Sequence, residues 1–100
     1  MLLTANDRER RVEVSAGTVV TVRLPEEATT GYRWTIEAGE GLEQAGDRVE
    51  PPGAIGGGST RELQFRATRP GTRDLRMKKW REWEGDGSVI DRFAVTIIVK

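Results

Sequence analysis

The sequence predicts an all-β fold, and three observations support this prediction. Apolar residues alternate with polar residues in several segments, and a period of two is typical of half-buried strands. Glycine and proline residues lie between these segments, as turns require. No long segment shows the three- and four-residue apolar spacing of a helix. Short strands joined by turns favour a two-layer β-sandwich.

The first three predicted strands end at residues that break the alternation. Residues 12–14 alternate until a glycine ends the run. Residues 20–24 form a half-buried strand that stops at Pro25. Residues 32–36 contain Trp34 in phase with their other apolar positions, so we expect this tryptophan in the core.

The remaining predicted strands complete the sandwich. Residues 63–67 alternate up to a turn at residues 69–72, and residues 75–77 continue the pattern after it. Residues 93–99 form the last alternating segment. The intervening stretches are predicted to be loops: residues 25–31, 39–59 and 78–88.

The composition indicates one domain, residues 1–100, that needs no cofactor. One hundred residues suffice for a single core, and an apolar share of 36% suits a thin sandwich. Sixteen basic residues balance sixteen acidic ones, which favours neither a nucleic-acid partner nor a membrane surface. Cysteine and histidine are both missing, so disulfides, thiolate or imidazole metal sites and histidine-based catalysis are excluded.

The N-terminal residues do not have the pattern of a signal peptide. Met1-Leu2-Leu3 is too short an apolar run and is followed by charged residues. We therefore expect a cytoplasmic monomer, or a periplasmic or secreted one if a leader has been removed. No run of the sequence is long and apolar enough to span a membrane.

Acidic and glycine-rich segments could in principle indicate an enzyme, but their patterns do not. Glu82, Glu84 and Asp86 lie close together, and two carboxylates can hydrolyse a glycoside, yet surface acids are usually just solvated. The glycines of residues 53–58 precede a strand pattern, whereas a phosphate-binding loop opens a helix. We therefore expect a binding protein with no catalytic residues.

Two tryptophans and two glycine-containing segments are better candidates for binding. Trp80 and Trp83 lie among charged residues, and exposed tryptophan is a frequent energetic anchor of protein interfaces. Residues 29–31 form a narrow Thr-Thr-Gly tip, although a structural turn would also explain the glycine. The glycines of residues 56–58 could bring bare backbone against a partner.

Taken in order, these loops resemble those of the chagasin-like inhibitors of papain-family cysteine proteases. The first family motif is matched by Glu27-Ala28-Thr29-Thr30-Gly31-Tyr32, the second by Ile55-Gly56-Gly57-Gly58-Ser59-Thr60 and the third by Arg81-Glu82-Trp83-Glu84. Two departures stand out. Glu27-Ala28 replaces the family's Asn-Pro, and Glu82 replaces its Pro. Proline stiffens a loop before binding, so its loss raises the ordering cost of association.

The resemblance implies an immunoglobulin-like β-sandwich of about seven or eight antiparallel strands. It also implies a reversible inhibitor that blocks the active-site cleft of a papain-like protease with three loops. The protease-binding residues would be Thr29, Thr30, Gly31, Tyr32, Gly56, Gly57, Gly58, Arg81 and Trp83. The alternative is a non-inhibitory adhesion or carbohydrate-binding sandwich that uses Trp80 and Trp83 as a stacking platform.

Overall fold

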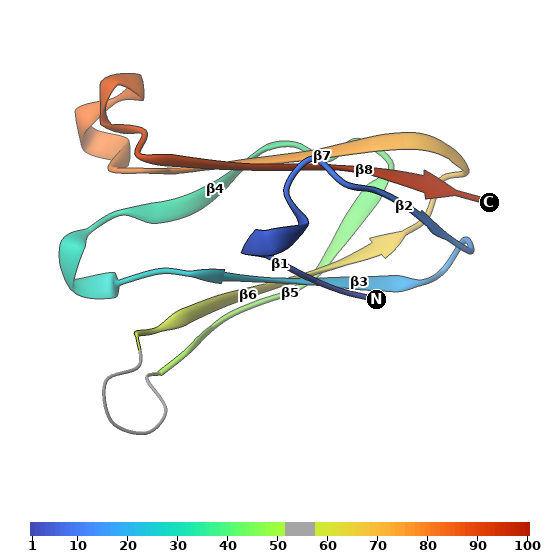
Figure 1. Ribbon diagram of the computed structural model, residues 1–100, viewed down its shortest axis with the longest axis horizontal. Coiled ribbons are helices and arrows are strands. Elements are labelled where there is room, and N and C mark those ends of the chain that lie inside the picture. The colour runs from blue at the N-terminus through green and yellow to red at the C-terminus, as the bar shows by residue number, and fades with distance from the viewer. Residues whose placement is uncertain (52–57) are drawn as a thin grey trace.

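Two four-stranded sheets face each other through the apolar positions that alternate along their strands (Figure 1). The computed structural model describes residues 1–51 and 58–100. Within these residues one sheet has the strand order β1-β3-β6-β5 and the other β2-β8-β7-β4. The strands are β1 (Leu2–Thr4), β2 (Arg11–Val14), β3 (Val19–Pro25), β4 (Arg33–Ala38), β5 (Leu42–Glu50), β6 (Thr60–Ala67), β7 (Gly71–Trp80) and β8 (Asp91–Val99).

In the described part of the chain, four short 3-10 turns lie between strands. They are η1 (Ala5–Asp7), η2 (Ala28–Thr30), η3 (Glu82–Glu84) and η4 (Asp86–Ser88). No helix in the described residues could cross a bilayer. The predicted all-β sandwich is confirmed.

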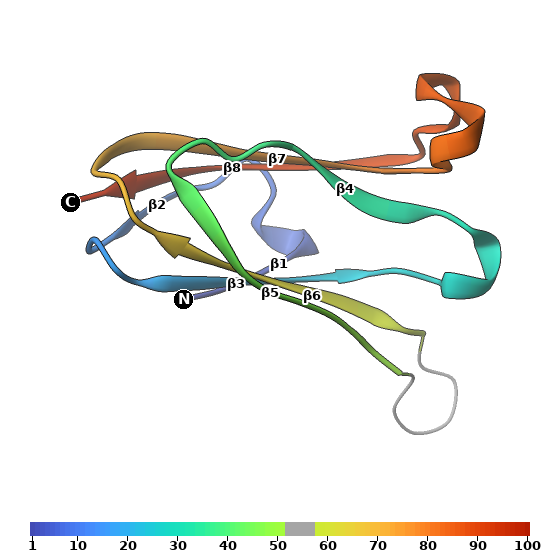
Figure 2. The same cartoon turned by 180° about the vertical axis from the view of Figure 1, so that it is seen from behind.

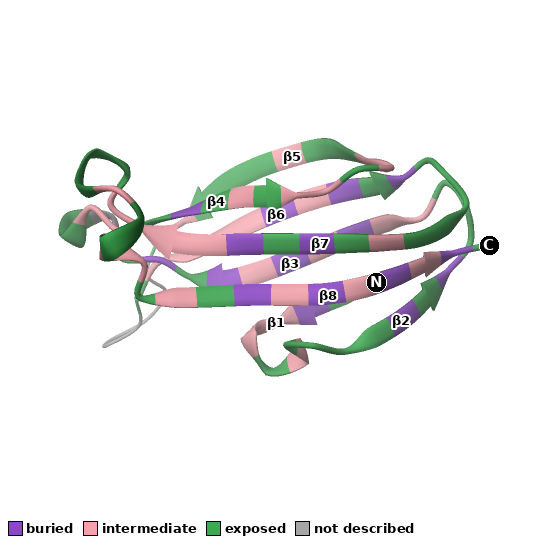
Figure 3. Ribbon diagram, turned by 90° about the horizontal axis from the view of Figure 1, so that it is seen from above, coloured by how far each residue is buried: buried purple, intermediate pink, exposed green. Residues whose placement is uncertain are grey.

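The core lies between the sheets and contains the residues that the alternation predicted. Buried positions alternate with exposed or half-buried ones along β7 and β8, as Figure 3 shows from above. Trp34 is only 2% exposed and belongs to this core, which confirms its predicted place. The buried apolar residues are Leu3, Val12, Val14, Val20, Val22, Leu24, Trp34, Leu63, Phe65, Ala67, Leu75, Met77, Phe93, Val95, Ile97 and Val99.

The first two strands do not follow the antiparallel expectation. β1 pairs in parallel with β3, and β2 pairs in parallel with β8. The chain passes through η1 between the two sheets, so β1 and β2 lie at the edges of different sheets instead of pairing as a hairpin. Alternation reveals which residues face the core but not the direction of a strand's neighbour.

Two strands were absent from the sequence prediction. β1 is only three residues long, too short to display a period, although its Leu3 is fully buried. β5 lies inside the stretch predicted as the second loop, and most of its residues are exposed because it forms the edge of its sheet. It is held by its ladder with β6 and by ion pairs across that ladder, from Arg48 to Glu62 and from Arg61 to Asp47. Charged side chains also protect such an edge from pairing with other chains.

Candidate functional site

The strands that flank the three predicted loops end together at one end of the sandwich. In the first sheet, Pro25 and Glu50 are both in register with Thr60. In the second sheet, Lys79 is in register with Asp91. The η2, η3 and η4 turns extend from this end, and the C-terminus lies at the opposite one (Figures 1 and 2). We call it the loop end.

The Thr-Thr-Gly segment forms the tip of the first loop. Thr29 and Thr30 are exposed, while Gly31 and Tyr32 are half-buried. Gly31 has a φ of +79°, a left-handed conformation that glycine adopts without strain. The turn that the glycine predicted is therefore confirmed, and it presents two small hydroxyl side chains to solvent.

Hydrogen bonds within the first loop hold the shape of this tip. The backbone N–H of Thr30 donates to the carbonyl of Glu27 over 3.1 Å, and the Thr30 hydroxyl donates to the same oxygen over 2.8 Å. The Tyr32 N–H donates to the Thr30 hydroxyl over 3.4 Å. The tip is thus fixed by its own residues, although the proline of the family motif is absent.

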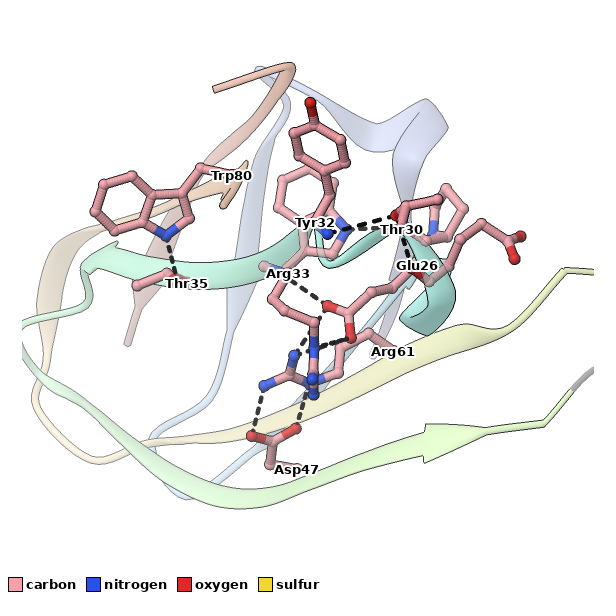
Figure 4. A network of polar contacts seen from close by, with 11 residues as sticks. Glu26, Thr30, Tyr32, Arg33, Thr35, Asp47, Arg61 and Trp80 are labelled. Atoms are coloured by element: carbon pink, nitrogen blue, oxygen red, sulfur yellow. Dashed lines mark hydrogen bonds and ion pairs between the residues drawn. The ribbon is translucent and has the colours of Figure 1, made fainter. Parts of the chain in front are cut away.

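A fully buried carboxylate, Glu26, lies at the base of the same loop (Figure 4). It accepts hydrogen bonds from the Arg33 Nε at 2.9 Å, the Trp34 backbone N–H at 2.8 Å and the Arg61 Nη1 at 2.9 Å. The Trp34 indole N–H also donates to the Pro25 carbonyl, over 2.9 Å. No local pattern in the sequence predicted this residue, because its burial depends on an arginine distant in the sequence.

Arg81 connects the third loop to the first. Its Nε donates to the Thr30 carbonyl over 3.0 Å, and its guanidinium carbon lies 4.3 Å from the centroid of the Tyr32 ring. Its Nη1 also pairs with Glu84 at 3.0 Å within the third loop. The Ser88 hydroxyl accepts from the Arg81 backbone N–H over 3.0 Å, and this bond joins the two ends of the third loop. The sequence-predicted residues of these two loops therefore form one contiguous cluster.

Trp83 is the most exposed large apolar residue of the described chain, with 72% of its surface accessible. Its ring rests on Gly31: a Cβ atom added to that glycine would lie 2.6 Å from the Trp83 Cη2. Glycine is thus required at position 31 both for its backbone angle and for this close approach. An exposed indole placed beside the Thr-Thr-Gly tip is suited to anchor a partner.

Trp80 differs from Trp83. The sequence predicts it in a loop, but the structure places it in a strand. It is the last residue of β7 and is half-buried. Its indole N–H donates to the Thr35 hydroxyl over 2.9 Å, and the Lys78 ammonium lies 3.6 Å from its ring centroid. The loop prediction was wrong because β7 continues through a charged segment in which apolar residues do not alternate with polar ones.

The second predicted loop is described only at its end. Gly56 and Gly57 lie outside the described residues, whereas Gly58 is exposed. The Glu27 carboxylate packs against Gly58 where a side chain would otherwise stand. This contact brings the first loop next to the start of β6.

Charge pairing also organises the strands beneath the second loop. Arg61 on β6 pairs with Asp47 on β5, and these hydrogen bonds lower the pKa of the Asp47 carboxyl. A lowered pKa means that the pair stabilises the fold above the unfolded pKa of Asp47, and that this contribution is lost as the pH falls through the folded value.

Within the described residues, no group of three acidic side chains could hold a metal ion.

Comparisons with known proteins agree on one family. The model of the family described as chagasin family peptidase inhibitor I42 matches residues 13–97. Chagasin of Trypanosoma cruzi is 28% identical over 90 residues, which cover 82% of each chain. Amoebiasin-2 of Entamoeba histolytica is 24% identical over 104 residues, covering 99% of this chain and 85% of that protein.

Solved structures show the same fold. The crystal structure of the cysteine protease inhibitor EhICP2 from Entamoeba histolytica superposes with a TM-score of 0.86 at 20% identity, covering 99% of this chain and 93% of that one. PbICP-C, solved in complex with falcipain-2, superposes with a TM-score of 0.64 at 14% identity, covering 99% and 98% of the two chains.

Proposed function

This chain belongs to the chagasin family of peptidase inhibitors, and we propose that its loop end closes the active-site cleft of a papain-like cysteine protease. The chain is a cysteine protease inhibitor and not an enzyme. The observation that supports this use of the loop end most directly is the cluster joining the first and third loops. In this cluster Arg81 bonds to the Thr30 carbonyl while Trp83 packs on Gly31.

In the proposed mechanism, the Thr-Thr-Gly tip enters the cleft beside the catalytic cysteine of the protease. The tip is narrow because its exposed side chains are small, and η2 curls Ala28–Thr30 into a turn instead of an extended strand. A peptide bond held in a turn is not offered to the nucleophile in the geometry that reaction requires. The complex would therefore form reversibly and without cleavage.

Residues on both sides of the tip would contact the walls of the cleft. Trp83 would pack on an apolar surface of the protease, with Arg81 holding the third loop against the first. Gly58, together with Gly56 and Gly57, would bring backbone against the other wall. Because the described loops are already fixed by hydrogen bonds, little conformational freedom would be lost on docking.

Internal contacts offset the loss of the family's prolines. Thr30 bonds twice to Glu27 within the first loop, and Arg81 bonds to both Thr30 and Glu84. These bonds restrict the loops much as a fixed proline φ would. Glu82 stays exposed at the position of the other missing proline.

The alternative role in carbohydrate binding gains no support from the geometry. A stacking platform would need Trp80 and Trp83 to offer free ring faces side by side. Instead Lys78 lies over the Trp80 ring on β7, whereas Trp83 rests on the first loop. The two indoles therefore have separate surroundings.

Replacing Thr30 with arginine is expected to raise the inhibition constant for papain at least about tenfold, equivalent to about 1.4 kcal/mol. The long charged side chain would widen the tip that has to enter the cleft, and the Thr30 hydroxyl bonds would be lost. The matched control is Thr72→Arg, an exposed threonine at the opposite end of β7. Equal inhibition by Thr30→Arg and the wild type would show that this loop does not enter the cleft.

Replacing Gly31 with alanine is expected to reduce both stability and inhibition. Alanine is strained at the positive φ of residue 31, and this strain should destabilise the chain by about 1–2 kcal/mol. The new methyl group would also push the Trp83 ring away. Gly17→Ala is the control, because Gly17 has a φ of +92° but no neighbour within 4 Å of its added Cβ. Urea unfolding should show a similar loss for both variants, whereas only Gly31→Ala should weaken papain inhibition. Unchanged inhibition by Gly31→Ala would contradict a binding role for the Trp83 contact.

A further inference from the structure

The Glu26 carboxylate has no access to solvent, and each of its oxygens accepts more than one hydrogen bond. Oε1 accepts from Arg33 and Arg61, and Oε2 accepts from Arg61 and the Trp34 N–H. A buried ion pair often adds little net stability compared with apolar residues of similar size. Its value can lie instead in fixing one geometry among several, because hydrogen bonds are directional and apolar contacts are not.

The contacts of Glu26 reach both sides of the loop end (Figure 4). Through the Trp34 N–H it binds the start of β4, where the first loop enters the other sheet. Its own backbone N–H donates to the Ser59 carbonyl over 3.1 Å, next to Gly58. Through Arg61 it binds the start of β6, and Arg61 continues to Asp47 on β5.

Glu26 therefore joins the base of the first loop to both strands that flank the second. The adjacent residue, Glu27, packs on Gly58, which precedes the Ser59 that Glu26 binds. If the carboxylate lost its partners, the first loop and the start of β6 could shift relative to each other while the core below stayed intact.

We infer that Glu26 is a positioning residue for inhibition: it fixes the Thr-Thr-Gly tip relative to the stem of the second loop, so that both meet a protease cleft as one rigid unit. This inference rests on the proposed function. Glu26 is covered and would not touch the protease. It would act by raising the fraction of molecules whose loops are in register for binding.

Glu26→Gln is the most direct test, because it keeps the size of the side chain and removes its charge. If only about a tenth of the molecules then hold both loops in register, the inhibition constant for papain rises about tenfold. Inhibition is measured at a temperature where circular dichroism shows the variant fully folded. The matched control is Glu62→Gln, on β6, which breaks ion pairs with Arg23 and Arg48 but touches neither loop. The control is expected to inhibit within about twofold of the wild type.

Hydrogen–deuterium exchange gives a second readout, because a merely stabilising role would not raise exchange selectively beside the two loops. In Glu26→Gln, amides of residues 26–34 and 58–62 should exchange faster together, while those of β7 and β8 remain protected. If the variant loses only global stability, exchange rises throughout and the inhibition constant of the folded protein is unchanged. That result would overturn the inference.

A milder variant covers the case in which Glu26→Gln does not fold. Asp47 has a side chain that is 41% exposed, so Asp47→Asn should fold while weakening the hold on Arg61. We expect a rise of about threefold in the inhibition constant and faster exchange in residues 58–62. No change in either would overturn the inference. A wild-type chain that failed to inhibit any papain-like protease would instead refute the proposed function, and the exchange experiment would still test the linkage.

Discussion

Trp34→Ala is expected to lower the free energy of unfolding by about 3–5 kcal/mol, as the loss of a buried tryptophan usually does. Trp34 is 2% exposed and packs in the core between the sheets. The substitution would leave a cavity and also remove the indole hydrogen bond to the Pro25 carbonyl. Urea unfolding followed by fluorescence or circular dichroism measures the loss.

Trp80→Ala is the matched control, because Trp80 is half-buried on the neighbouring strand β7, where its indole N–H donates to the Thr35 hydroxyl. It should destabilise the chain clearly less than Trp34→Ala. If the two variants were equally stable, the assignment of Trp34 to the core would be wrong.

Trp83→Ala is expected to weaken papain inhibition by about thirtyfold, or about 2 kcal/mol, with a much smaller effect on unfolding. The ring is largely exposed and contacts Gly31 instead of the core, so it contributes little to folding. In a complex it would be covered, and buried aromatic anchors carry much of the energy of an interface. Parallel measurements of the inhibition constant and of urea unfolding separate the two effects.

Trp80→Ala again provides the comparison, since it removes an indole that lies on the outer strand surface. It should leave inhibition nearly unchanged. If Trp80→Ala weakened inhibition and Trp83→Ala did not, the anchor would be Trp80 and the match of Arg81-Glu82-Trp83 to the third family motif would be wrong. If Trp83→Ala unfolded the chain instead, Trp83 would be a lid on the core.

The sequence was informative about the fold where burial follows a simple period. Residues 20–24, 63–67 and 93–99 alternate clearly, and each lies in a strand with its apolar side chains in the core. β5 could not be predicted in this way, because an edge strand is stabilised by backbone pairing and surface ion pairs that leave no apolar pattern.

The candidate site was predictable in its composition but not in its contacts. The ordered motifs identified Thr30, Gly31 and Trp83 as a group, and the structure brings them together. Glu26 could not be recognised, because a glutamate after a proline is ordinarily exposed in a turn. Its burial is made possible by Arg61, which no local pattern in the sequence connects to it.

Titration of papain with the wild-type chain, while hydrolysis of a small substrate is followed, tests most directly whether the loop end blocks the cleft. We expect activity to fall to near zero at one equivalent of inhibitor, competitively with substrate, and the inhibitor to be recovered uncleaved. Full activity in the presence of a large excess, or cleavage of the chain within residues 29–32, would contradict the proposal that the loop end blocks the cleft.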